Sequence, residues 1–347
     1  MPEFAISFAV ALLASFGMTP SVRQFALHIG MVDHPGPRKV HQAPVPLMGG
    51  LAIYLGVLLA WLVSLEGRGA WSQVLGILAG ATLLAIVGLL DDRGLLHHQI
   101  KLMLAMPVAA LILLASGIRI QLFSALFPGP YSPWLDSALT VFWVVGITAS
   151  FSILDHMDGL CAGAAAIASG FVTLLAILHS HLLVATLAAA VMGASIGFLR
   201  WNFNPAKIFM GDGGAMFLGF MLATLTIKLR FVGMAPSVGW MLPVLVLSIP
   251  VFDTTLVSIS RARRGLIPFM TPGKDHAAHR LANLGLGQRG AVLVLYALGF
   301  VTGLLALGMT CLTPRQAAGL GAALLVAVLS AIAALERAPF ERQSKPH

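Results

Sequence analysis

Three acidic motifs in this sequence have the residue types and spacing that metal-assisted phosphate chemistry needs. Asp91 and Asp92 are adjacent and directly follow an apolar run. Asp155 and Asp158 lie three residues apart, so a helical turn would place both carboxylates on one face. Asp212 lies between glycines at the beginning of another apolar run. Because neighbouring carboxylates repel one another unless a cation is present, and hard oxygen ligands suit Mg²⁺, the motifs indicate a divalent cation site.

The longest polar stretch, residues 259–290, adds cations and imidazoles to these acids. It contains His276 and His279, which share a face if the segment is helical, and Arg280 follows directly. A zinc site would need more ligands than this stretch offers. Basic groups and imidazoles beside carboxylates fit a phosphate-rich anion better, although the basic run 261–264 could instead contact anionic lipid headgroups. Lys39, in an earlier polar loop, is a further candidate phosphate contact or a simple orientation charge.

The elements that position these residues are predicted to be membrane-spanning helices. The chain has 347 residues, of which 58% are hydrophobic and only 10% charged, whereas soluble domains carry about 25% charged residues. Continuous apolar runs near the length of a spanning helix favour helices over a β-barrel. The eleven runs are 4–20, 48–65, 74–90, 100–117, 138–154, 160–178, 182–199, 212–229, 238–258, 291–311 and 316–335. We therefore expect one all-α polytopic integral membrane domain over residues 1–347.

Lysine and arginine set the expected orientation. With eleven spans and a cytoplasmic C-terminus, 16 of the 21 basic residues face the cytoplasm, and the N-terminus lies outside. The five on the other side are Arg68, Arg119, Lys228, Arg230 and Arg315. The net charge of +8 is thus mostly a topology signal, and nucleic acid is a poor explanation for it. Eight of the nine Asp residues fall on the cytoplasmic side as well, which topology does not explain.

The positions of the two cysteines and the absence of an obvious internal repeat argue against some alternatives. Cys161 and Cys311 lie within or at the ends of apolar runs, so neither a disulfide framework nor a cysteine metal cluster is supported. A transporter or flippase for an anionic solute or lipid stays open as another class, but acids on one face and no inverted repeat argue against it. The extended acidic motif of CDP-alcohol phosphatidyltransferases does not follow Asp158-Gly159.

Taken in order, the polar segments resemble the polyprenyl-phosphate N-acetylhexosamine-1-phosphate transferase family, which includes the MurNAc-pentapeptide transferase of peptidoglycan synthesis. The resemblance covers about residues 32–286, and residues 204–212 (Asn-Pro-Ala-Lys-Ile-Phe-Met-Gly-Asp) are the closest match. The other matching segments are 38–42 with 46–50, 90–93 with Lys101 downstream, 155–159, 253–254 and 276–279.

The resemblance implies a reaction and a set of roles. A UDP-N-acetylhexosamine, most simply UDP-GlcNAc, would donate its sugar 1-phosphate to undecaprenyl phosphate and release UMP, which would initiate a cell-envelope polysaccharide such as lipopolysaccharide. The alternative donor within the family is UDP-MurNAc-pentapeptide. Asp212 and Asp91 would bind Mg²⁺, or Mn²⁺ as a substitute, and Asp92 would orient or deprotonate the lipid phosphate. A two-step route through an aspartyl nucleophile stays open.

The remaining residues are assigned to substrate contacts by the same resemblance. Asp155, Asp158 and Phe209 would form the uridine pocket. The contacts to phosphate or sugar would come from Lys39, Lys101, Ser152, Asn204, His276, His279 and Arg280. The enzyme would lie in the bacterial inner membrane among membrane lipids, with its active site facing the cytoplasm, and a homodimer is one assembly that the family allows.

Four positions depart from the family's pattern. Ser152 and His156 replace an Asn and a Gly of the segment around Asp155, Ala215 replaces a Ser, and Ala278 replaces one His of the histidine loop. These changes leave the metal and nucleotide contacts in place, and sugar recognition is the property that they leave open.

Overall fold

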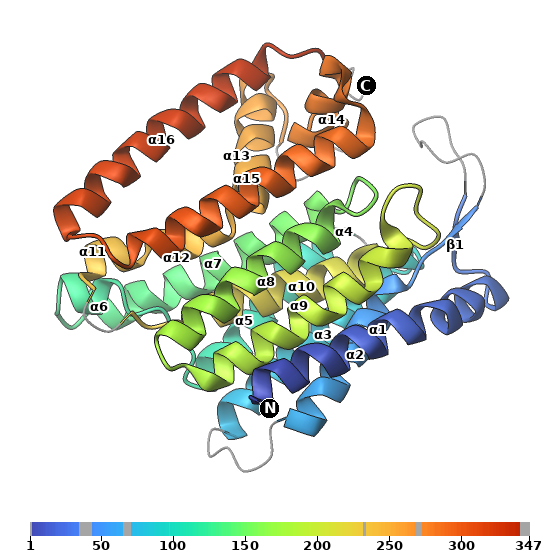
Figure 1. Ribbon diagram of the computed structural model, residues 1–347, viewed down its shortest axis with the longest axis horizontal. Helices are drawn as coiled ribbons and strands as arrows, with labels where there is room; N and C mark the ends of the chain where they lie inside the picture. Colours follow the sequence, from blue (N-terminus) through green and yellow to red (C-terminus); the bar gives the residue numbers. More distant parts are fainter. Residues whose placement is uncertain are drawn as a thin grey trace.

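Helices make up nearly the whole of the protein. The computed structural model describes residues 2–34, 44–64, 71–96, 98–231, 234–267 and 273–340 (Figure 1). The long helices are α1 (Glu3–His28), α2 (Gly49–Ser64), α3 (Trp71–Asp92), α7 (Ser132–Leu154), α8 (Leu160–Leu178), α9 (Leu182–Asn202), α10 (Gly211–Lys228), α13 (Ser248–Arg263), α15 (Gly287–Met309) and α16 (Pro314–Glu336). The shorter ones are α4 (His98–Ile100), the π-helical turn η1 (Lys101–Ala105), α5 (Met106–Ala115), α6 (Phe123–Leu126), α11 (Pro236–Gly239), α12 (Met241–Val246), α14 (Ala277–Leu281) and the π-helical turn η2 (Ala282–Leu286).

Each of the eleven apolar runs coincides with helix, which confirms the all-α class. Within the described ranges, seven helices are long and apolar enough to cross a membrane, and the number becomes eight if one bent pair counts as a single span. The helices α2 and η1–α5 are shorter than this requirement. The chain is therefore a multi-pass membrane protein, while eleven spans and their orientation stay predictions.

The run 238–258 is not the continuous helix that its hydropathy predicts. It is divided into Pro236–Val246 and Ser248–Arg263, which are bent by 84° at Leu247. Pro250 explains the break, because its ring would clash with the carbonyl four residues earlier, at Val246, and it has no N–H to donate there. Hydropathy averages over a window and cannot detect this local steric conflict.

The helix α10 forms the centre of the bundle. Its residues are almost all buried, and it packs against α2, α3, α7, α8 and α9, whereas α16 runs along the outer edge (Figure 1). Glycines allow the closest of these approaches: a Cβ at Gly50 in α2 would collide with the backbone of Gly214. Because lipid gives helices no hydrophobic reason to associate, small residues at such contacts are the main source of packing energy.

A short antiparallel ribbon ties the beginning of α2 to the beginning of α10. Strand β1 (Val32–Asp33) pairs with β2 (Val45–Pro46), with Val32 opposite Pro46. The amide of Phe209 donates to the carbonyl of Pro46 at 2.8 Å, and the Gly50 amide donates to Met210 at 2.9 Å. These bonds fix the segment that leads into α10, and therefore the place of Asp212.

We expect Gly50→Ala to destabilise the fold by about 1–3 kcal/mol, the usual cost of overpacking a rigid contact. The added methyl group would push α2 away from Gly214 on α10. Gly308→Ala is the matched control, because a Cβ at that position in α15 meets nothing within 4 Å. Thermal unfolding in detergent should show a lower midpoint for Gly50→Ala and an unchanged or higher one for Gly308→Ala. Equal midpoints for the two variants would contradict the close contact.

Candidate active site

Asp91, Lys101 and Asp212 meet at one end of the bundle. Asp91 lies in the last turn of α3, Lys101 is the first residue of η1, and Asp212 lies in the first turn of α10. The Lys101 ammonium donates to Asp91 Oδ2 at 2.8 Å and to Asp212 Oδ2 at 2.5 Å. The three side chains keep 16–20% of their surface exposed. Two carboxylates thus face one cation, and all three groups stay partly accessible to an ion or an anionic ligand.

Asp92 points instead into the backbone at the beginning of α10. Its carboxylate accepts from the amide of Asp212 at 2.8 Å and from that of Gly213 at 3.3 Å. The first amides of a helix have no partner within the helix, and a carboxylate there is also favoured by the helix dipole. Gly211 has φ 75°, and a Cβ on it would collide with the Asp92 carboxylate, so glycine is required at this position. The adjacent acids therefore have different surroundings.

Ser152 and Asp155 complete the wall around Asp212. The Ser152 hydroxyl donates to Asp212 Oδ1, and the Gly211 amide donates to the Asp155 carboxylate. Burial, together with the charges of Asp212 and Asp92, raises the pKa of Asp155 to about 8. Asp155 lies just beyond the end of α7, and this raised pKa favours its protonated form at neutral pH. Of the predicted site residues, the structure brings together Asp91, Asp92, Lys101, Ser152, Asp155 and Asp212, and the roles assigned to them stay predictions.

Asp158 and Asn204 hold two loops together. Asp158 Oδ2 accepts from Asn204 Nδ2 and from the Ala206 amide, both at 3.0 Å. Asn204 Nδ2 also lies 3.0 Å from Gln288 Oε1, which links the pair to α15. Phe209 is half-buried in the segment held by β2 and α2. The uridine contacts assigned to Asp158 and Phe209 stay predictions, and the structure gives Asp158 and Asn204 a positioning role besides.

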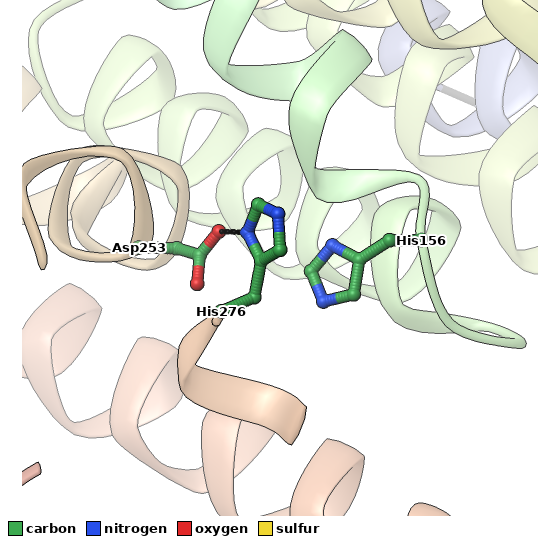
Figure 2. Close-up of side chains that lie close together, drawn as sticks. All are labelled: His156, Asp253 and His276. Atoms are coloured by element: carbon green, nitrogen blue, oxygen red, sulfur yellow. Dashed lines mark hydrogen bonds and ion pairs between the residues drawn. The ribbon is translucent and has the colours of Figure 1, made fainter. Parts of the chain in front are cut away.

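Two histidines, His156 and His276, lie beside Asp253 (Figure 2), and His279 is a third ring close to both. His276 Nδ1 lies 2.8 Å from Asp253 Oδ2, and the other Asp253 oxygen accepts from the Ala277 amide at 2.7 Å. The His156 ring stacks on His276 with 4.1 Å between centroids and lies 4.8 Å from His279. In the sequence, His156 is only a departure from the family's pattern, because 120 residues separate it from His276. Two departures together could have indicated its place in the site. The family usually has glycine at the position of His156, and this chain lacks one histidine of the histidine loop.

Side-chain distances alone would also permit a metal among His156, Asp253 and His276, whose ligand atoms lie within 4.8 Å of one another. The two imidazoles are 26° from parallel, so their in-plane lone pairs run side by side instead of converging. His156 Nδ1 already bonds the Ile153 carbonyl, and burial beside His276 lowers the pKa of His156 to about 3. The cluster is better described as a hydrogen-bonded dyad with stacked neutral rings. The oxygen donors of Asp91 and Asp212, which already hold one cationic group, fit Mg²⁺ better.

Arg280 bonds to neighbouring protein groups and not to the carboxylate cluster. It is fully buried, and its guanidinium donates to the Asp275 carbonyl, the Leu335 carbonyl and the Ser260 hydroxyl at 2.7–2.8 Å. These bonds dock the end of α16 onto α14, so in this structure Arg280 positions the histidine loop and contacts no open site. Arg261 and Arg264, considered as lipid contacts, form ion pairs with buried Asp275. Lys39 lies outside the described residues.

The fold and this site together define a multi-pass membrane enzyme with its polar groups gathered at one end of the bundle. The model of glycosyl transferase family 4 matches residues 74–230. A protein of Bacillus subtilis, described as a probable undecaprenyl-phosphate N-acetylglucosaminyl 1-phosphate transferase, is 37% identical over 87% of this chain and 83% of its own length.

Other relatives extend the likeness over nearly the whole chain. A decaprenyl-phosphate N-acetylglucosaminephosphotransferase of Mycolicibacterium smegmatis is 32% identical over 97% of this chain and 90% of its own length. An undecaprenyl-phosphate alpha-N-acetylglucosaminyl 1-phosphate transferase of Yersinia pestis is 27% identical over 79% of this chain and 75% of its own. The chain belongs to the polyprenyl-phosphate N-acetylhexosamine-1-phosphate transferase family, as its motifs predict.

The raised pKa of Asp155 predicts a particular pH dependence of stability. Between about pH 4 and pH 8 the Asp155 side chain is protonated in the folded protein but ionised in the unfolded chain, where its pKa is near 3.8. The contribution of Asp155 to stability therefore falls as the pH rises through this range. In EDTA, the thermal midpoint of Asp155→Asn should exceed that of the wild type by a margin that widens from pH 4 to pH 8 and is constant above it. A margin independent of pH would rule out the raised pKa.

Proposed function

We propose that the protein transfers N-acetylglucosamine 1-phosphate from UDP-GlcNAc to undecaprenyl phosphate and releases UMP. The relatives' names support both the sugar phosphate and the polyprenyl phosphate acceptor. The observation that carries the proposal is the Asp91–Lys101–Asp212 cluster at one end of a membrane bundle. A lipid acceptor requires an enzyme in the membrane, and a doubly charged diphosphate donor requires cations at the reacting group.

In this reaction an oxygen of the lipid phosphate attacks the phosphorus that carries the sugar, and the bond from that phosphorus to UMP breaks. The two reactants repel one another, so the protein's main task is to position them and offset their charge. Asp91 and Asp212 would hold Mg²⁺, which supplies positive charge to the donor diphosphate when bound. Lys101, released from one carboxylate, then donates to a phosphate oxygen.

The capping role of Asp92 suits a reaction that needs no strong base. A phosphate monoester has its second pKa at about 6, so the lipid phosphate is largely dianionic at pH 7 and is already a nucleophile. Asp92 holds the first turn of α10 and thereby aims Asp212. Its direct contact with the lipid phosphate belongs to this proposal, as do the uridine contacts of Asp155, Asp158 and Phe209.

The histidine cluster would meet the sugar and its phosphate. Asp253 accepts from Nδ1 of His276, which leaves Nε2 available to a substrate oxygen. His156 stacks on that ring and restricts its rotation. His276 and His279 therefore take the sugar-phosphate contacts, and Asp253, His156 and Arg280 position them.

The charge bias favours a site that faces the cytoplasm of a bacterial cell, in the inner membrane, where the product would begin an envelope polysaccharide. A transporter would need polar groups along a path through the membrane. The acids at this end instead lie close together, with Asp91, Asp92, Asp155 and Asp212 in one cluster.

Purified protein, radiolabelled UDP-sugars, undecaprenyl phosphate and Mg²⁺ test the function directly. Label from UDP-GlcNAc should enter the organic phase with equimolar UMP, and EDTA should abolish the transfer. Mn²⁺ should restore it in part. Transfer of label from UDP-MurNAc-pentapeptide in place of UDP-GlcNAc would contradict the proposed donor, and no transfer from any UDP-sugar would refute the reaction.

Asp212→Asn should lower kcat by at least about 100-fold, because it removes charge from the metal-binding pair, and an electrostatic group at a reacting centre commonly contributes that much. Asp92→Asn should lower kcat less, since the one amide oxygen of Asn still accepts from one of the two α10 amides. Glu3→Gln, the same change of carboxylate to amide at the far end of α1, is the control and should leave activity unchanged. Near-normal UMP release by Asp212→Asn in folded protein would overturn the metal assignment.

A further inference from the structure

A second polar site lies at the end of the bundle opposite the carboxylates. A cavity of about 330 Å³ opens there, lined by residues that include Gln73, Arg119, His181, Lys228 and Arg230. They come from the beginning of α3, the segment after α5, the α8–α9 connection and the end of α10. The cavity is within the range of small-molecule sites, about 300–1,000 Å³.

The position of this cavity follows from two helices that also carry the carboxylate site. Gln73 and Asp91 are separated along α3 by about 27 Å, and Asp212 and Lys228 along α10 by about 24 Å, at 1.5 Å per residue. These lengths approach the thickness of the hydrocarbon core, about 30 Å. The cavity and the carboxylates therefore lie near opposite faces of the membrane.

The cavity collects most of the basic residues expected on its side of the membrane. Five of the 21 basic residues fall there by the positive-inside rule, and Arg119, Lys228 and Arg230 all line this one cavity. His181 adds an imidazole, whose Nε2 lies 2.7 Å from the Arg230 carbonyl. The positive-inside rule alone predicts few lysines and arginines on this face of the membrane. The presence of three of them in one cavity therefore needs another explanation.

These cations have no acidic partner within the part of the chain that the structure describes. The Lys228 ammonium donates to the amide oxygen of Gln73, and none of the three makes an ion pair with a described carboxylate. Asp136, an acid of the neighbouring α7, is fully buried, and its oxygens accept from the amides of Phe123 and Ser124. Like charges gathered in a cavity repel unless an anion from outside neutralises them.

The rim of the cavity suggests the kind of molecule that carries this anion. Leu182 lines the cavity and is 58% exposed, and Trp71, two residues before Gln73, is 55% exposed. Large apolar side chains exposed near a helix end face lipid, and tryptophan is favoured at the headgroup level. An amphipathic ligand could place its phosphate among the cations and its acyl chains against these side chains.

We propose that this basic cavity binds the phosphate headgroup of an anionic phospholipid from the leaflet opposite the carboxylate site. Arg119, Lys228 and Arg230 supply the cations, and Gln73 holds Lys228 in place. Free inorganic phosphate has the same headgroup chemistry but gains nothing from the apolar rim. The proposal is independent of the transferase reaction.

Binding of short-chain lipids to the purified protein tests the proposal without an activity measurement. Dioctanoyl phosphatidylglycerol, dioctanoyl phosphatidylcholine and inorganic phosphate are titrated separately, and thermal shift and native mass spectrometry report binding. The wild type should bind phosphatidylglycerol and retain it in the spectrometer. Arg119→Gln/Arg230→Gln should bind it about thirtyfold more weakly, as expected for the loss of two cations near a headgroup.

Arg315→Gln is the matched control, because Arg315 is exposed at the beginning of α16 and does not line the cavity. It should bind phosphatidylglycerol like the wild type. If the double variant does not fold, Arg230→Gln alone is used, since Arg230 is exposed and its replacement leaves the core intact. Equal binding of phosphatidylcholine, equal weakening by Arg315→Gln, or saturation by inorganic phosphate with no gain from the lipid would each overturn the proposal.

Discussion

The carboxylate of Asp92 on the first amides of α10 is the interaction on which the site depends. The helix is buried along nearly its whole length, so its unpaired N-terminal amides cannot turn to water. A carboxylate from the end of α3 satisfies two of them and draws the two helix ends together. Because Asp91 and Asp212 adjoin these bonds in sequence, they are brought together as a consequence. Lys101 then offsets the charge that this arrangement concentrates.

The hydrogen-bond partners of the aspartates distinguish those that position loops and helices from those that can take part in the reaction. Asp92, Asp158 and Asp253 each accept from at least one backbone amide, and each ties one loop or helix end to another. Asp91 and Asp212 are different, because the side-chain contacts described for them come from movable groups, chiefly Lys101. An ammonium can move away when a metal or a phosphate arrives, whereas a backbone amide of a buried helix cannot. The acids that share Lys101 are therefore the ones free to change partners during a reaction.

Hydropathy predicted every long helix, and residues 160–178 even have the predicted bounds, because burial in lipid or protein selects apolar side chains residue by residue. The motifs also predicted that Asp91 and Asp212 lie together, and they placed Lys101 among the substrate contacts without pairing it with these acids. The sequence does not predict the hydrogen-bond partners of individual side chains, because these depend on how distant segments pack in the folded chain. From the sequence, Arg280 is a candidate phosphate contact. In the structure its guanidinium donates to the carbonyls of Asp275 and Leu335 and to the Ser260 hydroxyl. The different surroundings of Asp91 and Asp92 likewise depend on which of two adjacent side chains faces α10.

The length of α10 explains how a charged site can lie at membrane depth. Between Asp212 and Lys228 the helix offers an apolar stretch shorter than the hydrocarbon core, so its charged ends would lie inside the lipid if α10 stood alone. Its neighbours prevent this. The helices α3 and α7 have 22 and 23 residues and pack against it, so protein surrounds α10 instead of lipid. Polar groups at such depth are tolerated where protein or a water-filled cavity surrounds them. A short central helix enclosed by longer ones therefore holds Asp212 at the level where the phosphate of a membrane lipid can reach it, and the same geometry leaves Lys228 at the corresponding level on the other face.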